Sequence, residues 1–231
     1  MVSNELNTDI DSSSVNLCGI LRFLCGYLKK SYLHHRMQSP LLLLQSISKY
    51  IQLTTEEENY FLSLLQSRKI KKKQFVSQEG DINNSAKFVL SGLLRLYSVD
   101  KNGFEHIIQF APSGWWIGDL MSYQKQQPGN LFIDAIEETE IIEIPRSAME
   151  QLFEEVPKFE RFFRILSENA LSAYQQRLSA NLSLPAKDRF GYFVELYPSL
   201  LQHLPQKYIA SYIGVTPEFL SKMLNQPASA K

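Results

Sequence analysis

The side chains best suited to chemistry gather near the C-terminal end of the sequence. Glu218 can accept a hydrogen bond from a cytosine amino group, and Lys222 can reach guanine or a phosphate. Gln206 and Lys207 precede them in a spacing that suits contacts with the sugar–phosphate backbone. Four further residues are expected on the same surface: Thr216, Pro217, Ser221 and Asn225. Together these residues predict a surface that contacts the major groove of double-stranded DNA.

These side chains can contact DNA only if two short helices hold them at a fixed crossing angle. The residue spacing from Leu204 to Leu224 favours that arrangement. Ala210 is the small residue that a helix crossing requires, and Gly214 tolerates the left-handed dihedrals of the turn. Thr216 caps the second helix, with Pro217 at its first position. The expected inward anchors are Ile209, Ile213, Val215, Leu220 and Met223. The agreement of these spacings predicts a helix-turn-helix, although a generic helical hairpin shares some of them.

Residues that could hold a metal or a cofactor are sparse. The two cysteines, Cys18 and Cys25, form no CxxC pair, and they are too few for an iron–sulfur cluster. The histidines are scattered at His34, His35, His106 and His203. We therefore expect no metal and no cofactor, and the cysteine usage fits a reducing cytoplasm.

Catalytic motifs are also missing from the sequence. HExxH, GxSxG, P-loop and GxGxxG patterns do not occur. Asp119 lies near Trp115 and Trp116, and a carboxylate in such an apolar pocket would have a raised pKa. The favoured alternative is a turn-capping acid beside core tryptophans. We expect that the protein is not an enzyme.

Charge is balanced over the whole chain. The 24 basic and 24 acidic side chains give a formal net charge of zero, which argues against a polybasic partner surface. A local DNA-binding face remains compatible with this balance, because the phosphate field extends over about 8–10 Å. From Asn181 to Lys231 there are five Lys or Arg and three Asp or Glu, a net charge of +2. DNA binding is therefore expected to be modest and salt-sensitive.

Residues 1–36 are expected to be a disordered or doubtful extension. Met1 to Asn16 is polar, whereas Leu17 to Leu28 is apolar and interrupted by Arg22. A membrane span needs about 20 apolar residues, and the positive charge follows this run instead of preceding it as in a signal peptide. The alternatives are a short interfacial helix and an untranslated stretch with Met37 as the true start, of which the second is favoured. We expect no membrane partner.

Residues 37–156 have the pattern of a β domain flanked by helices. Helices are predicted over 40–67, with a new start at Thr54, and at Arg146–Phe153. Between Gln74 and Pro145, apolar runs alternate with turn residues at intervals of about 8–12 residues. Asp100-Lys101-Asn102-Gly103 is a strong hairpin signal. The strands predict a jelly roll or small barrel.

Residues 157–183 are predicted to form one long helix. Its apolar stripe consists of Phe159, Phe162, Phe163, Leu166, Ala170, Ala173 and Tyr174, and Arg177 is expected outside it. A long helix beside a compact sheet needs a second surface to cover it, so we expect a homodimer through this helix. Packing against its own domain is the alternative. Residues 184–231 would then form the DNA-binding domain.

Four segments resemble one known family: Ser91 to Arg95, Ile117 to Leu120, Phe162 to Leu171 and Leu204 to Met223. On these segments the chain resembles the cyclic-AMP receptor / fumarate–nitrate regulator (Crp/Fnr) family, and looks closest to its short Bacteroidetes-type members. The resemblance implies an α+β fold with an N-terminal cyclic-nucleotide-binding-type β jelly roll flanked by helices. A long dimerisation helix and a C-terminal helix-turn-helix without a wing would follow. It also implies a homodimeric transcription regulator at a palindromic operator.

The effector pocket implied by the resemblance departs from the family pattern. Members that bind cyclic AMP carry Gly-Glu-Leu-Gly and an Arg-Ser or Arg-Thr pair. The corresponding residues here are Gly118, Asp119, Leu120, Met121, Gly129 and Asn130. Loss of the arginine removes a phosphate contact worth about 2–5 kcal/mol. We expect a degenerate pocket that does not bind cyclic AMP and takes an unknown small molecule or nothing.

Two functions follow from these observations. The first is a sequence-specific DNA-binding regulator, in which Glu218 matches the family, Lys222 keeps the charge and Pro217 replaces an arginine. The second is a ligand-sensing or protein-interaction module of the same fold that does not bind DNA. The weak charge and the missing wing favour the second, and the intact helix-turn-helix spacing favours the first.

Overall fold

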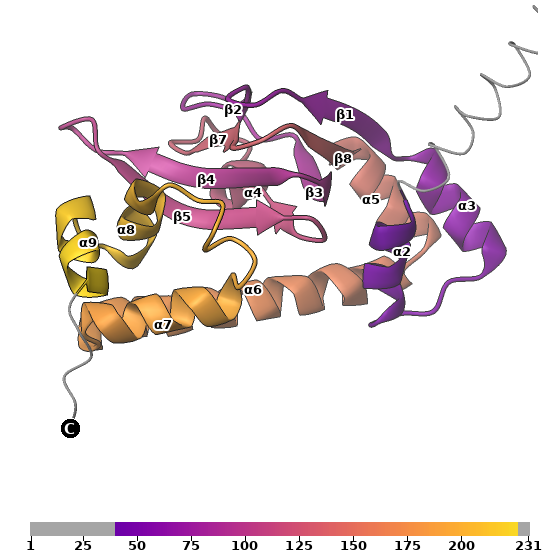
Figure 1. The fold of residues 1–231 in the computed structure, drawn as a ribbon. Coiled ribbons are helices and arrows are strands. Elements are labelled where there is room, and N and C mark those ends of the chain that lie inside the picture. The colour runs from indigo at the N-terminus through magenta and orange to yellow at the C-terminus, as the bar shows by residue number, and fades with distance from the viewer. Residues whose placement is uncertain (1–39, 226–231) are drawn as a thin grey trace, which may run out of the picture. The chain divides into compact units, whose positions relative to one another are not determined.

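The β domain consists of two antiparallel four-stranded sheets (Figure 1). The computed structural model describes residues 40–225, so the predicted extension 1–36 lies outside the described residues. One sheet has the order β1 (Gln66–Ile70), β8 (Thr139–Pro145), β3 (Ser85–Ser91) and β6 (Trp116–Ile117). The other has the order β2 (Phe75–Ser77), β7 (Phe132–Ala135), β4 (Leu93–Val99) and β5 (Glu105–Pro112). The predicted jelly roll is confirmed.

The turns between strands use the residues that the sequence singled out. Asp100 accepts hydrogen bonds from the backbone N–H groups of Asn102 (2.8 Å) and Phe104 (3.0 Å), and Gly103 has a φ of 83°. This closes the predicted β4–β5 hairpin. Gly92 joins β3 to β4 with a φ of 88°, a backbone conformation that residues other than glycine rarely adopt.

The space between the sheets is filled by apolar side chains. The buried residues of this cluster are Ile70, Val89, Leu94, Leu96, Ala111, Ile117, Ile133, Ala135 and Ile141. They alternate along their strands with residues that face away, as expected for strands that bury one side. Removal of this apolar surface from water stabilises the roll.

Helices close one end of the roll. Thr54 caps α3 (Thr55–Ser63) through a capping box with Glu57, and Phe61 of α3 stacks on Phe159 with ring centroids 4.7 Å apart. The flanking helices are α2 (Leu41–Ser48) and α5 (Arg146–Glu155), and the short α4 (Leu120–Lys125) was not predicted. The predicted helical range 40–67 was wrong at its end, because Gln66 already pairs with Glu143 in β8.

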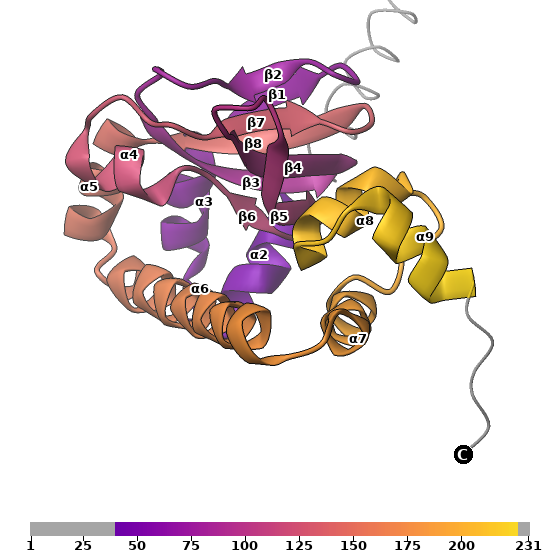
Figure 2. The same ribbon diagram turned by 90° about the vertical axis from the view of Figure 1, so that its left-hand side faces the viewer.

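Helices α6 (Lys158–Ser183) and α7 (Ala186–Leu196) run beneath the strands, separated by the break at Leu184 and Pro185 (Figures 1 and 2). Phe159 and Phe162 of α6 are fully buried, whereas nearly all of the helix beyond Ala170 is exposed. The first half of the predicted stripe is therefore buried within its own chain. The second half is more exposed, although the Tyr174 hydroxyl donates a hydrogen bond to Gln109 Oε1 of β5 at 3.4 Å. No helix within residues 40–225 has the length and apolar character needed to cross a membrane.

Lys87 in β3 is buried, with 5% of its surface exposed. Its ammonium donates hydrogen bonds to Asn83 Oδ1 (2.6 Å) and to the carbonyl oxygen of Ser85 (3.1 Å). Burial lowers the pKa of Lys87 to about 8, although Glu143 opposes this shift. Lys87 therefore gives up its proton more readily than a lysine that is exposed to water.

We predict that Gly92→Ala destabilises the protein by about 3 kcal/mol or more, because strain at positive φ and a backbone collision add together. A Cβ at Gly92 would collide with the carbonyl oxygen of Glu138 and lie 2.7 Å from Thr139 Cα. The control is Gly103→Ala, where φ is 83° and no atom lies within 4 Å of the added Cβ. It should cost only about 1 kcal/mol. Urea unfolding midpoints measure both, and equal losses would contradict the collision.

We also predict that the fold gains stability from Lys87 as the pH rises from about 8 to 10.5, because over that range the unfolded chain binds more protons. The gain is at most about 1.4 kcal/mol per pH unit. Lys87→Met removes it, so the free energy of unfolding of the wild type minus that of the variant should increase between pH 7 and pH 9.5. Lys69→Met, at an exposed position of β1, is the control and should show no such increase. A difference for Lys87→Met that stays constant with pH would refute the prediction.

Candidate nucleic-acid interface

The C-terminal helices α8 (Gln206–Ile213) and α9 (Pro217–Asn225) form the predicted helix-turn-helix. Gly214 ends α8 with a φ of 71°, and its N–H group bonds to the carbonyl oxygens of Ala210 and Ser211. Thr216 Oγ1 accepts a hydrogen bond from the N–H group of Phe219 at 3.2 Å. The predicted left-handed turn and hydroxyl cap are both present.

The two helices are held together by the predicted anchors. Ile209, Ala210, Ile213 and Leu220 are buried, and Val215 and Met223 pack against them while partly buried. Because Ala210 has no side chain beyond Cβ, the helices can approach closely where they cross. The packing fixes which face of α9 is left exposed.

The predicted DNA-contacting residues lie on that exposed face. At 3.6 residues per turn, the five that belong to α9 fall within an arc of about 140°: Pro217, Glu218, Ser221, Lys222 and Asn225. Of these, Ser221 is half-buried and the others are exposed. Gln206, Lys207 and Thr216 are exposed as well, at the starts of the two helices. Phe219 adds an apolar group, 52% exposed, that the sequence analysis did not assign to this surface.

Helix α8 packs against strand β5, which is the last strand of its sheet. The Ser211 hydroxyl donates a hydrogen bond to the carbonyl oxygen of Glu105 (2.6 Å) and accepts one from the N–H group of Ile107 (2.9 Å). A single side chain therefore satisfies two backbone groups of an edge strand. Sequence reasoning missed this contact, because nothing in the spacing of α8 indicates a partner 104 residues away.

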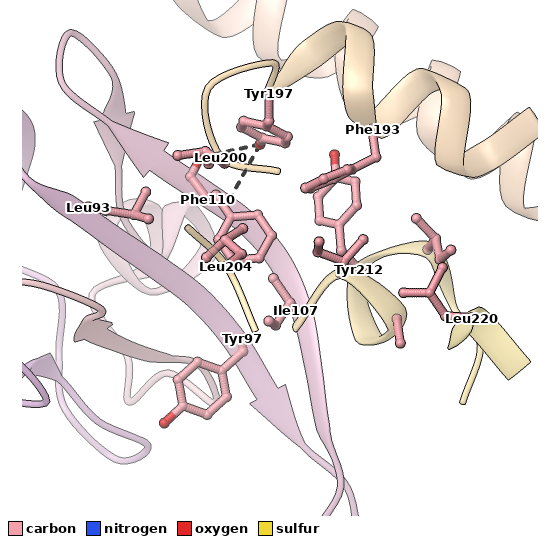
Figure 3. Packing of buried hydrophobic residues seen from close by; sticks show 13 residues of the cluster. Leu93, Tyr97, Ile107, Phe110, Phe193, Tyr197, Leu200, Leu204, Tyr212 and Leu220 are labelled. Atoms are coloured by element: carbon pink, nitrogen blue, oxygen red, sulfur yellow. Dashed lines mark hydrogen bonds between the residues drawn. The ribbon is translucent and has the colours of Figure 1, made fainter. Parts of the chain in front are cut away.

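An aromatic cluster joins the roll to the C-terminal helices (Figure 3). Phe110 of β5 meets Phe193 and Tyr197 edge to face, with ring centroids 6.2 Å and 5.7 Å away. The Tyr197 hydroxyl donates a hydrogen bond to the carbonyl oxygen of Phe110 at 3.2 Å. Burial raises the pKa of Tyr197, so the phenol stays a neutral donor. Tyr212 and Leu220 extend the cluster into α8 and α9.

Arg177 of α6 connects three elements. Its guanidinium donates hydrogen bonds to the carbonyl oxygens of Ile107 and Ile108 in β5 and of Tyr212 in α8, and it lies 3.8 Å from the Tyr212 ring centroid. The prediction that Arg177 lies outside the inward stripe was wrong. The signal was present, since Arg177 follows Ala173 by four residues and so shares its helix face.

Arg95 of β4 is another buried cation that faces α8. It is 5% exposed and forms paired hydrogen bonds with Asp134 (2.7 and 2.8 Å), and it also bonds to Glu105. Burial alone would lower the pKa of Arg95, but the hydrogen bonds to the two carboxylates raise it instead. The Tyr208 ring of α8 covers the guanidinium at 4.4 Å. Sequence analysis cited Arg95 only as part of a family segment.

The predicted effector residues do not all share one buried site. Asp119 accepts a hydrogen bond from the N–H group of Ser122 (3.0 Å) and caps α4, as the favoured alternative for this acid predicted. A side chain at Gly129 would collide with the Asp119 carboxylate, and Gly118 approaches Asn83 closely. By contrast, Leu120 is 62% exposed and Met121 is 53% exposed. Asn130 is exposed too.

A polar network lies beside Asp119. Asn83 donates to the Asp119 carbonyl oxygen (3.0 Å) and accepts from Lys87, whereas Asp119 Oδ2 is buried without a hydrogen-bond partner in the described part of the chain. Sequence analysis did not single out either Asn83 or Lys87. Among residues 40–225, no cluster of three or more His, Cys, Asp or Glu side chains is arranged to hold a metal ion.

Residues 67–156 match the cyclic nucleotide-binding domain. Over 193 residues the chain is 23% identical to the anaerobic regulatory protein of Haemophilus influenzae, covering 75% of this chain and 72% of that protein. It is 24% identical over 168 residues to the fumarate and nitrate reduction regulatory protein of Vibrio cholerae, covering 68% of this chain and 66% of that protein.

The fold is also that of a solved structure, FixK2 from Bradyrhizobium japonicum. The TM-score is 0.61 at 18% identity, and the match covers 72% of this chain and 89% of that one. In sequence and fold the chain is thus similar to regulators of the Crp/Fnr family, and it contains a cyclic nucleotide-binding domain.

Proposed function

We propose that the protein is a dimeric, sequence-specific DNA-binding transcription regulator. The observation that carries this proposal is the exposed arc of α9, which presents Glu218, Lys222 and Asn225 from a correctly capped and anchored second helix. In a helix-turn-helix this surface enters the major groove, where a carboxylate, an ammonium and an amide can each distinguish bases. Gln206 and Lys207 would contact the phosphate backbone.

Dimerisation through residues 157–183 is part of the proposal, and the geometry supports a stripe other than the one expected. Leu171, Leu178 and Leu182 are 59%, 60% and 80% exposed. With Gln175 they follow a four-three-four spacing, which is the seam of a two-stranded coiled coil. These residues face away from the side of α6 that carries Ala173 and Arg177. Pairing of two such seams would cover apolar surface that a monomer leaves in water.

A twofold pair of α9 helices implies a palindromic operator. Half-sites would lie about 34–36 Å apart, or one helical turn of DNA. Charge contributes little, since residues 186–225 hold four Lys or Arg against three Asp or Glu. Specific contacts to bases would therefore carry a larger share of the affinity than phosphate attraction does.

We also propose that the six predicted effector residues do not form a cyclic-AMP site. Gly129 and Asn130 provide no cation for a phosphate, and Leu120 and Met121 face solvent. The buried Lys87 is bonded to Asn83 and Ser85. A cyclic nucleotide placed there would have to break these bonds without gaining a guanidinium partner.

A second candidate function is a module of the same fold that does not bind DNA. The docking of α8 on β5 favours it, because Ser211 and Arg177 hold the helix-turn-helix against its own roll. If α8 and α9 are fixed to the roll in this way, the distance between the two α9 helices of a dimer is set by how the α6 helices pair. That distance would suit DNA only for one geometry of pairing. DNA selection separates the two functions.

We predict that selection from a random duplex pool at about 50 and 200 mM salt yields a palindrome. Lys222→Ala and Glu218→Ala should each weaken binding of the selected duplex by about 1–3 kcal/mol and relax one base position. Lys125→Ala, in the roll, is the control for loss of one positive charge and should leave affinity within twofold of wild type. No enrichment at either salt, from a dimeric preparation, would support the second function.

We predict that Leu178→Asp converts the dimer to a monomer, because two carboxylates would face each other across the seam. The control is Leu120→Asp in α4, which lies outside the seam. It makes the same substitution at a leucine of nearly equal exposure, since Leu120 is 62% exposed and Leu178 is 60% exposed. Sedimentation velocity at micromolar protein should show a monomer for the first variant and a dimer for the second. Two dimeric variants would rule out this seam.

A further inference from the structure

A cavity of about 620 Å³ is lined by residues of α6, α7, α8 and of strands β5 and β6, which belong to different sheets. None of the six predicted effector residues lines it. Its walls are largely aromatic: Trp115, Trp116, Tyr174, Tyr192, Phe193, Tyr197 and Tyr212. Volumes of about 300–1,000 Å³ with apolar walls and a few polar groups are typical of small-molecule sites.

Three residues that line the cavity carry buried donors without acceptors. Trp116 Nε1, Arg177 Nε and Arg189 Nε are all buried without a hydrogen-bond partner within the described part of the chain. All three residues line the cavity. A buried unpaired donor costs about 1–3 kcal/mol. Three of them around one cavity indicate that an acceptor belongs there.

The charge of the wall also favours a ligand with negatively charged acceptors. Arg177 and Arg189 line the cavity, whereas Glu195 is the only acidic residue in its lining. Neither arginine forms an ion pair with a carboxylate of residues 40–225. The Nη groups of Arg177 are already bonded to backbone carbonyls, but Arg189 has only one such bond, to the Asn181 carbonyl oxygen at 3.2 Å. Arg189 is therefore the cation with donors to spare.

We propose that this cavity binds a small molecule with a planar apolar body and an anionic group, and that this molecule is the effector of the regulator. The aromatic walls would stack against the planar body, and Arg189 with the unpaired N–H groups would bind the anionic end. The effector role rests on the proposed function, whereas the binding itself does not. An occupant would contact α6, the roll and the C-terminal helices at once, so its affinity would depend on how these parts are arranged.

The test uses anilinonaphthalene sulfonate, a flat apolar anion whose fluorescence rises in apolar sites, and its neutral relative phenylnaphthylamine. The full-length protein without DNA should bind the sulfonate saturably with one site per chain. Ala173→Trp, which fills the cavity from α6, should abolish that binding. Ser179→Trp, on an exposed face of the same helix that does not line the cavity, is the matched control and should retain it. Ala180→Trp is a second filling variant if Ala173→Trp fails to fold by circular dichroism.

The role of charge is tested by Arg189→Gln. It should weaken binding of the sulfonate about tenfold, or 1.4 kcal/mol, and change binding of the neutral probe less than twofold. Arg164→Gln, an exposed arginine of α6 paired with Glu168, should change neither. The proposal is overturned if the wild type binds no sulfonate saturably, if the filling variants still bind it, or if Arg189→Gln weakens both probes equally. Each of these results is obtained without DNA, so none depends on operator binding.

Discussion

The unpaired edge of strand β5 is the feature on which the arrangement of the C-terminal half depends. Covering the backbone groups of a sheet edge without giving them hydrogen-bond partners destabilises a fold. Here Ser211 pairs with Glu105 and Ile107, and Arg177 takes the carbonyl oxygens of Ile107 and Ile108. The same short stretch of strand therefore holds both α6 and α8. The aromatic cluster around Phe110 packs beside these polar contacts and includes Ile107 and Tyr212.

This arrangement gives the long helix two separate tasks on two faces. One face carries Ala173 and Arg177 and is directed at β5 and the cavity, and the opposite face carries the exposed seam from Leu171 to Leu182. Because a helix is stiff, a displacement at the first face is transmitted to the second. Under the proposed function, a ligand in the cavity would change the separation of two recognition helices without touching either of them.

Under the proposed function, the polar interior of the roll is the reason that the predicted effector residues would not hold a cyclic phosphate. Asp119 is committed to capping α4, and Lys87 is committed to Asn83. Both groups lie where water is excluded, so any rearrangement would leave a charge or an amide unpaired. The cavity beneath the sheet differs in the kind of group left unpaired. Its unpaired buried atoms are the donors Trp116 Nε1, Arg177 Nε and Arg189 Nε, whereas the unpaired atom beside α4 is the acceptor Asp119 Oδ2.

Local chemistry in the sequence was enough to predict the turns, the caps and the helix-turn-helix. Gly214, Thr216 and the Asp100 hairpin depend on dihedral preferences and on hydrogen bonds within a few residues, and these are encoded where they occur. The apolar spacing of α8 and α9 likewise predicted which residues are buried. Short apolar runs separated by turn residues predicted the roll, although the end of the first helical segment was placed too late.

Contacts between distant segments were decided only by the tertiary structure. From the sequence alone, Arg177 is one more polar residue on a long helix. In the fold, β5 supplies two carbonyl oxygens to its guanidinium, and Tyr212 of α8 supplies a third together with its ring. The cavity likewise has walls from α6, α7, α8 and the strands, so no single stretch of sequence contains it. Local preferences act over a few residues, whereas burial and the pairing of polar groups depend on which surfaces meet. That is why the helix-turn-helix could be predicted from the sequence, and the surface that holds it against the roll could not.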